Sequence, residues 1–228
     1  MGEHVTINGP DGAFTAYIAS PAQANGRALV VIQEIFGVNK VMRDLADTYA
    51  AQGYFAVVPD LFWRIQPGID ITDQTPEEWQ QAFDYFGKFN VDQGVVDIQA
   101  TIDYVRQIHA TIGAVGYCLG GLLAYLTATR TTINASVSYY GVGIQDRLAE
   151  ATAETKPLLL HVASEDSFVN KDAQAAMKAG LSGHAQIEMY TYEGLDHAFA
   201  RVGGEHYDAT GAKLANDRTM AFFAEALS

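Results

Sequence analysis

A chain of 228 residues with 49 % hydrophobic and 18 % charged residues is typical of a globular protein and long enough to bury a large core. It has 27 acidic and 14 basic residues, a formal net charge of −13, which argues against nucleic-acid and anionic-membrane partners. A single cysteine, no apolar run of ~18 residues and no leader-like start lead us to expect a cytoplasmic protein. The sequence leaves the oligomeric state open.

Strand and helix patterns alternate along the chain. Short apolar runs bounded by turn residues predict strands, and apolar residues at helical spacing predict helices. The predicted strands are 14–19, 28–33, 55–58, 112–115, 135–140, 158–162 and 187–192, and the predicted helices are 40–52, 76–88, 92–109, a helix leading from 122, 170–180 and 205–226. Without linker or repeat, this order predicts a single α/β domain over residues 1–228, with a mostly parallel central sheet and helices on both faces.

The stretch Gly-Tyr-Cys-Leu-Gly-Gly at residues 116–121 follows one of these strands and leads into a helix. Strand, sharp turn and helix with G-x-C-x-G at the turn match the nucleophile elbow of α/β-hydrolases, with cysteine in place of serine. The alternative is a buried structural thiol, because free cysteine is among the most buried residue types. The elbow favours Cys118 as a nucleophile.

An acid and a base follow the next strands. Asp166 lies just past the 158–162 strand and His197 just past the 187–192 strand. Nucleophile, acid and histidine in this chain order are typical of α/β-hydrolases, and ligands bind at this edge of open α/β sheets. Glu165 and Asp196 are alternative candidates for the acid.

These residue types can together hydrolyse an ester. His197 can take the proton of Cys118 and later activate the water that cleaves the acyl-enzyme, while Asp166 fixes the imidazole tautomer. The backbone N–H of Leu119, next to the nucleophile, is a candidate oxyanion-hole donor.

Two other classes of function stay open at this point. Cys118, His197 and a carboxylate could ligate zinc, but the long spacings lack the short paired-ligand pattern of most structural sites. The fold could also bind a small acid without turnover, although retention of all three groups favours catalysis. We expect no metal and no cofactor. His161, inside a predicted strand, is interpreted as a core residue.

Beyond the elbow, several segments resemble the dienelactone hydrolase family of α/β-hydrolases. The Gln-Glu-Ile-Phe-Gly and Gly-Tyr-Cys-Leu-Gly-Gly pieces are the most specific. The matching segments are 31–37, 53–54, 59–62, 116–121, 139–141 and 197–201. The resemblance covers most of the chain, implies an α/β-hydrolase fold and places the family's Cys-Asp-His triad on Cys118, Asp166 and His197.

The resemblance also implies roles near the Gln33 strand. In the family, a glutamate at the position of Glu34 holds the resting thiol until substrate displaces it. Ile35 would supply the second oxyanion donor, and Phe36 an apolar wall of the pocket. The alternative for Glu34 is a cap on the following helix.

The family's lactone substrates carry a carboxylate held by two arginines. Arg201, four residues after the histidine, matches one of them and could bind a carboxylate in bidentate fashion, but it could also be a surface arginine. The second arginine is missing, and Trp79 stands near its position with Phe83 as an aromatic neighbour. We therefore expect a small-molecule lactone or ester as substrate: a dienelactone (carboxymethylenebutenolide) first, within the catabolism of aromatic compounds, or alternatively a more apolar activated ester.

Overall fold

The computed structural model describes residues 2–228. Its strands form an eight-stranded sheet in the order β1-β2-β4-β3-β5-β6-β7-β8. The chain divides into two compact units, the first ending at Ala114 and the second beginning at Val115. No helix within residues 2–228 is long and apolar enough to cross a membrane.

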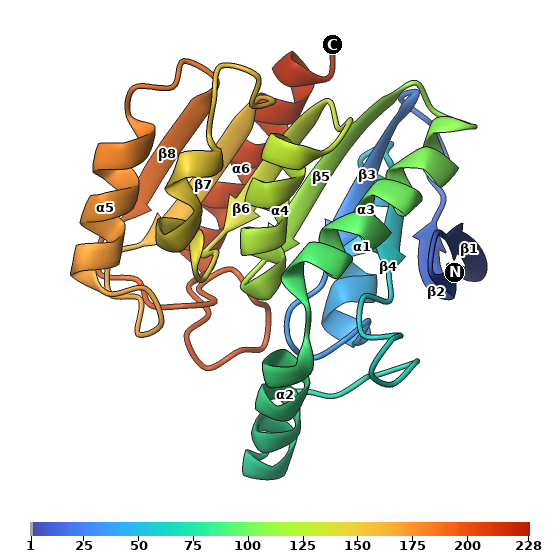
Figure 1. Ribbon diagram of the computed structural model, residues 1–228, viewed down its shortest axis with the longest axis horizontal. Coiled ribbons are helices and arrows are strands. Elements are labelled where there is room, and N and C mark those ends of the chain that lie inside the picture. The colour runs from blue at the N-terminus through green and yellow to red at the C-terminus, as the bar shows by residue number, and fades with distance from the viewer. Residues whose placement is uncertain (1) are drawn as a thin grey trace. The chain divides into compact units, whose positions relative to one another are not determined.

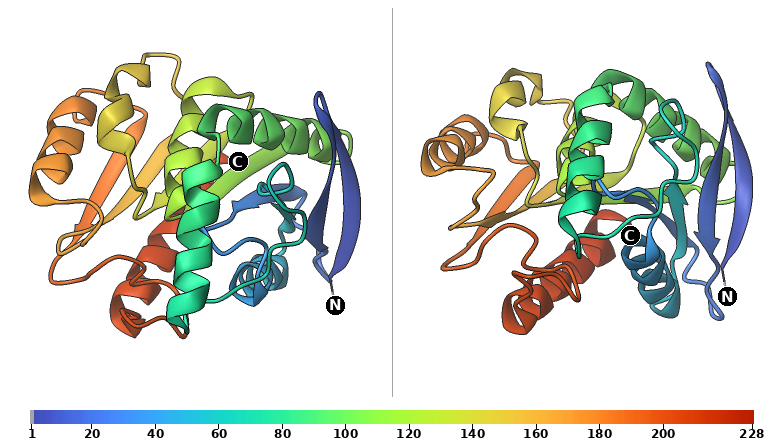
Figure 2. Two further views of the ribbon diagram at one scale, coloured as in Figure 1. Left: turned by 60° about the horizontal axis from the view of Figure 1, so that its bottom comes forward. Right: turned by 90° about the horizontal axis from the view of Figure 1, so that it is seen from below.

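Residues 2–114 contain four complete strands and three helices. They are β1 (Glu3–Gly9), β2 (Gly12–Ala19), β3 (Arg27–Ile32), α1 (Lys40–Ala51), β4 (Phe55–Pro59), α2 (Pro76–Lys88) and α3 (Val91–Arg106). Strands β1 and β2 pair antiparallel, β2 pairs antiparallel with β4, and β3 pairs parallel with β4. Strand β3 is fully apolar after its first residue, as expected for a strand covered on both faces. Figure 2 shows α1 and α3 on opposite faces of β3 and β4.

Side-chain caps set where the helices of this unit begin. Asn39 accepts a hydrogen bond from the N–H of Met42 at the start of α1. Thr75 accepts one from the N–H of Glu78 at the start of α2, and Pro76 occupies the first turn. These contacts satisfy N–H groups that have no partner within the helix.

The second unit begins within strand β5 (Thr111–Tyr117), which crosses the boundary between Ala114 and Val115. Its elements are α4 (Leu119–Arg130), β6 (Ala135–Tyr139), the 3₁₀ helix η1 (Ile144–Glu150), β7 (Leu158–Ala163), α5 (Lys171–Leu181), β8 (Ile187–Tyr192) and α6 (Ala209–Ala226). Strands β6, β7 and β8 pair in parallel. Figures 1 and 2 show α4 and α5 on one face of these strands and α6 on the other. The loops after β7 and β8 therefore start at the same sheet edge.

The predicted α/β-hydrolase fold with a mostly parallel sheet is confirmed, and two elements were not predicted. Strand β1 buries only Ile7 fully, so its sequence carries little hydrophobic alternation. Helix η1 is a short 3₁₀ segment with only Ile144 buried. The predicted helix 205–226 begins later, at Ala209, because Asp208 caps it through the N–H of Gly211. That residues 1–228 form one domain stays a prediction.

Candidate active site

Cys118 lies at the turn between β5 and α4 in a strained backbone conformation. Its φ is 56° and its ψ is −114°, a region that L-residues rarely adopt. Its N–H donates to the carbonyl of Tyr139 at the end of β6 at 3.1 Å. The half-buried thiol therefore leaves the strand direction at the N-terminus of a twelve-residue helix, where the helix dipole favours negative charge.

Two glycines make this turn possible. A Cβ on Gly116 would lie 1.8 Å from the carbonyl oxygen of Gly120, so no side chain fits between β5 and α4. A Cβ on Gly121 would lie 2.6 Å from the carbonyl oxygen of Tyr139. The motif is thus required for close packing of strand on helix, independently of chemistry. The N–H of Leu119, in the first turn of α4, belongs to the amides that have no partner within the helix.

His197 and Asp166 form a buried pair at the ends of β8 and β7. Nδ1 of His197 lies 2.9 Å from Oδ2 and 3.1 Å from Oδ1 of Asp166. The side chains are 4 % and 1 % exposed. Asp166 Oδ1 also accepts from the N–H groups of Phe168 and Val169, at 2.8 and 3.1 Å. These amides fix the carboxylate, and the carboxylate fixes the orientation of the imidazole.

Cys118 is close enough to change the protonation of His197. Burial by itself lowers the pKa of His197, but the charge of Cys118, hydrogen bonds between His197 and each of Asp166 and Cys118, and the charge of Asp166 outweigh it and raise the pKa to about 10. Within residues 2–228, Nε2 of His197 is buried without a hydrogen bond of ordinary geometry. We take the thiol and the imidazole to be adjacent but imperfectly aligned, which is common for catalytic hydrogen bonds in unliganded enzymes.

Two aromatic rings flank the imidazole. The ring of Tyr140 lies 5.0 Å from that of His197, and the ring of Phe168 lies 4.8 Å from it on an edge-to-face approach. Tyr140 has φ 39° and Ala198 has φ 62°, so with Cys118 they are the non-glycine residues of positive φ within residues 2–228. The sequence gave no signal for Phe168, because phenylalanine is not a residue type specific to active sites.

The two alternative acids do not touch the imidazole ring. Asp196 Oδ1 accepts from the backbone N–H of His197 at 2.6 Å. Glu165 binds Lys171 and the hydroxyl of Ser164 at the surface. Asp166 is therefore the carboxylate that the structure places against His197.

The remaining predicted residues near Gln33 belong to the first unit, where their roles beside Cys118 stay predictions. Glu34, Ile35 and Phe36 are all buried in the segment after β3. Glu34 is not the cap of the following helix, because Asn39 occupies that position. Phe36 contacts the half-buried ring of Trp79 edge-on with 5.1 Å between centroids, and Trp79 contacts Phe83 at 5.5 Å. The three rings form a continuous aromatic row.

Arg201 is not a surface arginine. It is 7 % exposed and follows the histidine loop, where its N–H donates to the carbonyl of Ala198 at 2.9 Å. His161 is a core residue as predicted: its Nε2 lies 2.9 Å from the Thr219 hydroxyl and its Nδ1 2.7 Å from the Tyr192 hydroxyl. Burial, with a smaller effect of the Arg218 charge, lowers the pKa of His161 to about 3.

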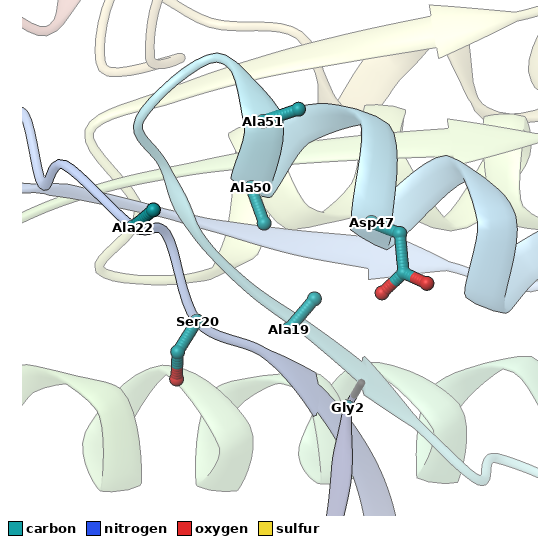
Figure 3. Close-up of a pocket in the computed structure, with 7 residues that line it drawn as sticks. All are labelled: Gly2, Ala19, Ser20, Ala22, Asp47, Ala50 and Ala51. Atoms are coloured by element: carbon teal, nitrogen blue, oxygen red, sulfur yellow. The ribbon is translucent and has the colours of Figure 1, made fainter.

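A separate pocket of about 310 Å³ in the first unit holds none of the predicted site residues. Figure 3 shows it lined by small side chains, with Asp47 as its one ionisable group. Its lining residues include no cysteine and no histidine. Within residues 2–228, no group of three or more His, Cys, Asp and Glu side chains is arranged to hold a metal ion.

Comparison with known proteins identifies a family. The model of the dienelactone hydrolase family matches residues 14–227. An Azospirillum brasilense protein named "putative carboxymethylenebutenolidase" is 47 % identical over 222 residues, covering 96 % of both chains. A carboxymethylenebutenolidase of Pseudomonas putida is 37 % identical over 226 residues, covering 97 % of this chain and 96 % of its own. The crystal structure of a "putative dienelactone hydrolase" from Klebsiella pneumoniae is 25 % identical and superposes with a TM-score of 0.84, covering 99 % and 98 % of the two chains.

Proposed function

Because the chain belongs to the dienelactone hydrolase family, we propose that it opens a dienelactone, a carboxymethylenebutenolide, through a Cys118-His197-Asp166 triad. The chain is a hydrolase of carboxylic ester or lactone bonds, as are relatives named carboxymethylenebutenolidase. The observation that carries the proposal is the buried His197–Asp166 pair, with Cys118 close enough to raise the His197 pKa. We further propose that the substrate is a small molecule met in the cytoplasm during catabolism of aromatic compounds.

The reaction proceeds through a thioester. The Cys118 sulfur attacks the lactone carbonyl, while N–H groups of Leu119 and Ile35 stabilise the oxyanion. His197 takes the proton of Cys118 as the sulfur attacks. The carbon–sulfur bond forms, the ring carbon–oxygen bond breaks, and the enolate expelled within the same molecule takes that proton from His197, which becomes neutral again. His197 then takes a proton from water, the resulting hydroxide cleaves the thioester, and the thiolate is regenerated.

Glu34 is proposed to hold the thiol before substrate arrives. It is a carboxyl group 2 % exposed in the segment after β3. A thiol held in its protonated form resists oxidation, since the thiolate is the reactive species. Displacement of Glu34 by substrate would release the thiol, which then gives its proton to His197. The thiolate formed in this way carries the charge that raises the pKa of His197 to about 10.

Arg201 is proposed to bind the substrate carboxylate. A buried guanidinium suits this role, because a charged hydrogen bond away from water is stronger than one at the surface. Phe36 and Trp79 would contact the unsaturated ring.

A second substrate class is favoured by the aromatic row of Phe36, Trp79 and Phe83. Trp79 stands near the position where the family's second arginine is expected, and its indole N–H donates to the Asp73 carbonyl at 2.9 Å. An apolar wall in place of a cation suits a neutral activated ester.

Two substrates test the lactone and the ester proposals: a dienelactone that bears a carboxylate, and a neutral aryl ester. Their hydrolysis is measured for the wild type, Cys118→Ala and Arg201→Met. We expect Cys118→Ala to lose both activities. Loss of a charged hydrogen bond should lower kcat/KM of Arg201→Met by about 10- to 100-fold for the dienelactone and much less for the ester. Arg147→Met, at an arginine with 40 % side-chain exposure, is the matched control. Dienelactone turnover that is insensitive to Arg201→Met would contradict the anchor, and hydrolysis of the ester alone would move the substrate to the apolar class.

A further inference from the structure

The carboxylate of Asp196 lies between the loop that carries Asp166 and the loop that carries His197. We propose that Asp196 is a positioning residue that fixes the geometry of the His197–Asp166 pair by tying these two loops together. The proposal rests on the proposed function, because it takes this pair as the one that serves Cys118.

One oxygen of Asp196 binds both loops. Its Oδ1 accepts from the N–H of His197 at 2.6 Å and from the N–H of Ser167 at 2.9 Å. Ser167 directly follows Asp166 in the chain. A single acceptor atom thus connects the backbone beside the acid with the backbone of the base.

The hydrogen bonds of Asp196 Oδ1 are one of two backbone contacts that flank Asp166. On the other side of the acid, the N–H of Glu165 donates to the Leu195 carbonyl at 2.8 Å. With both contacts, the residues before and after Asp166 are each held to the residues before His197. Without Asp196, the backbone after Asp166 loses its hydrogen bond to the residues before His197, and on that side the Asp166–His197 side-chain contact has to hold the two loops together.

The position of His197 needs such support because its neighbour is strained. Ala198 has φ 62°, a conformation that costs a non-glycine residue about 1–3 kcal/mol and persists only where surrounding contacts impose it. The Asp196–His197 hydrogen bond acts on the peptide immediately before the imidazole. It therefore limits how the histidine loop can relax.

The second oxygen of Asp196 faces the loop that follows. His206 Nδ1 lies 3.5 Å from Asp196 Oδ2 and 3.3 Å from the His197 carbonyl oxygen. Burial raises the pKa of Asp196, but the N–H groups of His197 and Ser167 and the charge of His206 outweigh it, and the pKa lies below its ordinary value. Asp196 is thus ionised at neutral pH, which strengthens its bonds to the two amides.

Asp196 does not contact the imidazole ring of His197, whose Nδ1 is bound to Asp166. Its influence on hydrolysis passes through the two backbones, so its loss disturbs the alignment of the base rather than the binding of substrate. Misplacement of a catalytic group by ~1 Å costs about 100-fold in rate. A partial misplacement should therefore lower kcat and leave KM almost unchanged.

The test compares Asp196→Ala with Asp196→Asn. The alanine variant lacks both acceptors, and we expect its kcat to fall by about 10- to 100-fold with KM within about threefold of the wild type. The asparagine variant keeps an oxygen at Oδ1, and we expect it to restore kcat to within about threefold. Glu193→Ala, which removes an exposed carboxylate from the same turn, is the matched control and should behave as the wild type.

A readout without substrate separates this proposal from the proposed function. The downfield proton resonance of His197 Nδ1–H reports its hydrogen bond to Asp166, and we expect it to broaden or vanish in Asp196→Ala and to persist in Asp196→Asn. If Asp196→Ala does not fold, Asp196→Ser replaces it, because its hydroxyl is one bond shorter and cannot span to the Ser167 amide.

An unchanged resonance and kcat in the alanine or serine variant would overturn the proposal. Equal losses in Asp196→Asn and Asp196→Ala would overturn it too, since the charge and not the shared acceptor would then be responsible. Wild-type protein that shows the resonance but hydrolyses neither ester nor lactone would refute the proposed function while leaving the positioning role intact.

Discussion

Asp166→Asn is the substitution for which the structure gives the sharpest expectation. Oδ1 of Asp166 accepts from the Phe168 and Val169 amides, whereas Oδ2 makes the shorter contact with His197 Nδ1, at 2.9 Å. In asparagine the amide oxygen must stay at the Oδ1 position, because the two backbone donors need an acceptor. The NH₂ group then takes the Oδ2 position and donates to Nδ1 of His197.

This contact forces His197 into the wrong tautomer. With Nδ1 as an acceptor, the neutral ring carries its proton on Nε2, which then cannot accept the proton of Cys118. The same change in a serine-hydrolase triad costs about 10⁴-fold in kcat, equivalent to about 5.4 kcal/mol, and we expect a loss of this order here. The pKa of His197 should also fall, because the contribution of the Asp166 charge disappears.

Steady-state hydrolysis of an activated ester and an NMR titration of the His197 ring measure the two effects. Asp172→Asn, at an exposed carboxylate in the first turn of α5, makes the same chemical change away from the pair and is the control. Folded Asp166→Asn protein with kcat within about tenfold of the wild type and an unshifted His197 titration would refute the reasoning.

Four further outcomes are expected. Cys118→Ala and Cys118→Gly should both abolish hydrolysis with the fold intact. Because glycine tolerates φ 56°, Cys118→Gly should be about 1 kcal/mol more stable than Cys118→Ala in urea unfolding. Wild-type-like rates or a reversed order of stability would contradict this. Gly116→Ala costs at least about 3 kcal/mol or prevents folding, since its Cβ would meet the Gly120 carbonyl at 1.8 Å; a melting temperature like that of the wild type would count against the packing argument. His197 loses its proton at about pH 10 in the folded protein but near pH 6.5 in the unfolded chain. The contribution of protonated His197 to the stability of the fold is therefore complete below about pH 6.5 and is lost as the pH rises to 10. The stability gap between wild type and His197→Gln should shrink over this range, and a widening gap would reverse the assignment. Glu34→Gln leaves folding intact but changes the rate at which iodoacetamide alkylates the resting thiol, and an identical rate would remove Glu34 from the proposed switch.

The sequence predicted those site residues that directly follow strands. Parallel strands bring their carboxyl ends to one edge of a sheet, so reactive residues just past them are expected to lie close together. Asp166 and His197 were found in this way, and the structure places them in contact. The choice between Asp166 and Asp196 could not be made from spacing alone, since both lie in loops. It depends on the loop conformation, in which backbone amides orient Asp166 towards the ring and Asp196 towards the backbone.

The strained residues could not be predicted for a different reason. Tyr140 and Ala198 are ordinary residue types with no preference for positive φ, so their conformation is imposed by tertiary contacts that sequence patterns do not encode. Strand β1 was missed because an edge strand with one fully buried residue resembles a polar terminus.

Three strained residues lie close to His197 in the second unit. Cys118 follows β5, Tyr140 follows β6 and Ala198 follows His197. The Cys118 N–H binds the Tyr139 carbonyl, the Tyr140 N–H binds the His161 carbonyl at 2.8 Å, and the Tyr140 ring packs on His197. Each strained residue costs about 1–3 kcal/mol, and a fold selected for stability alone would place glycine there. The strained conformations persist because the packed strand ends around His197 impose them. The chain thus gives up stability at residues that surround His197, as expected where a fixed local geometry matters more than stability.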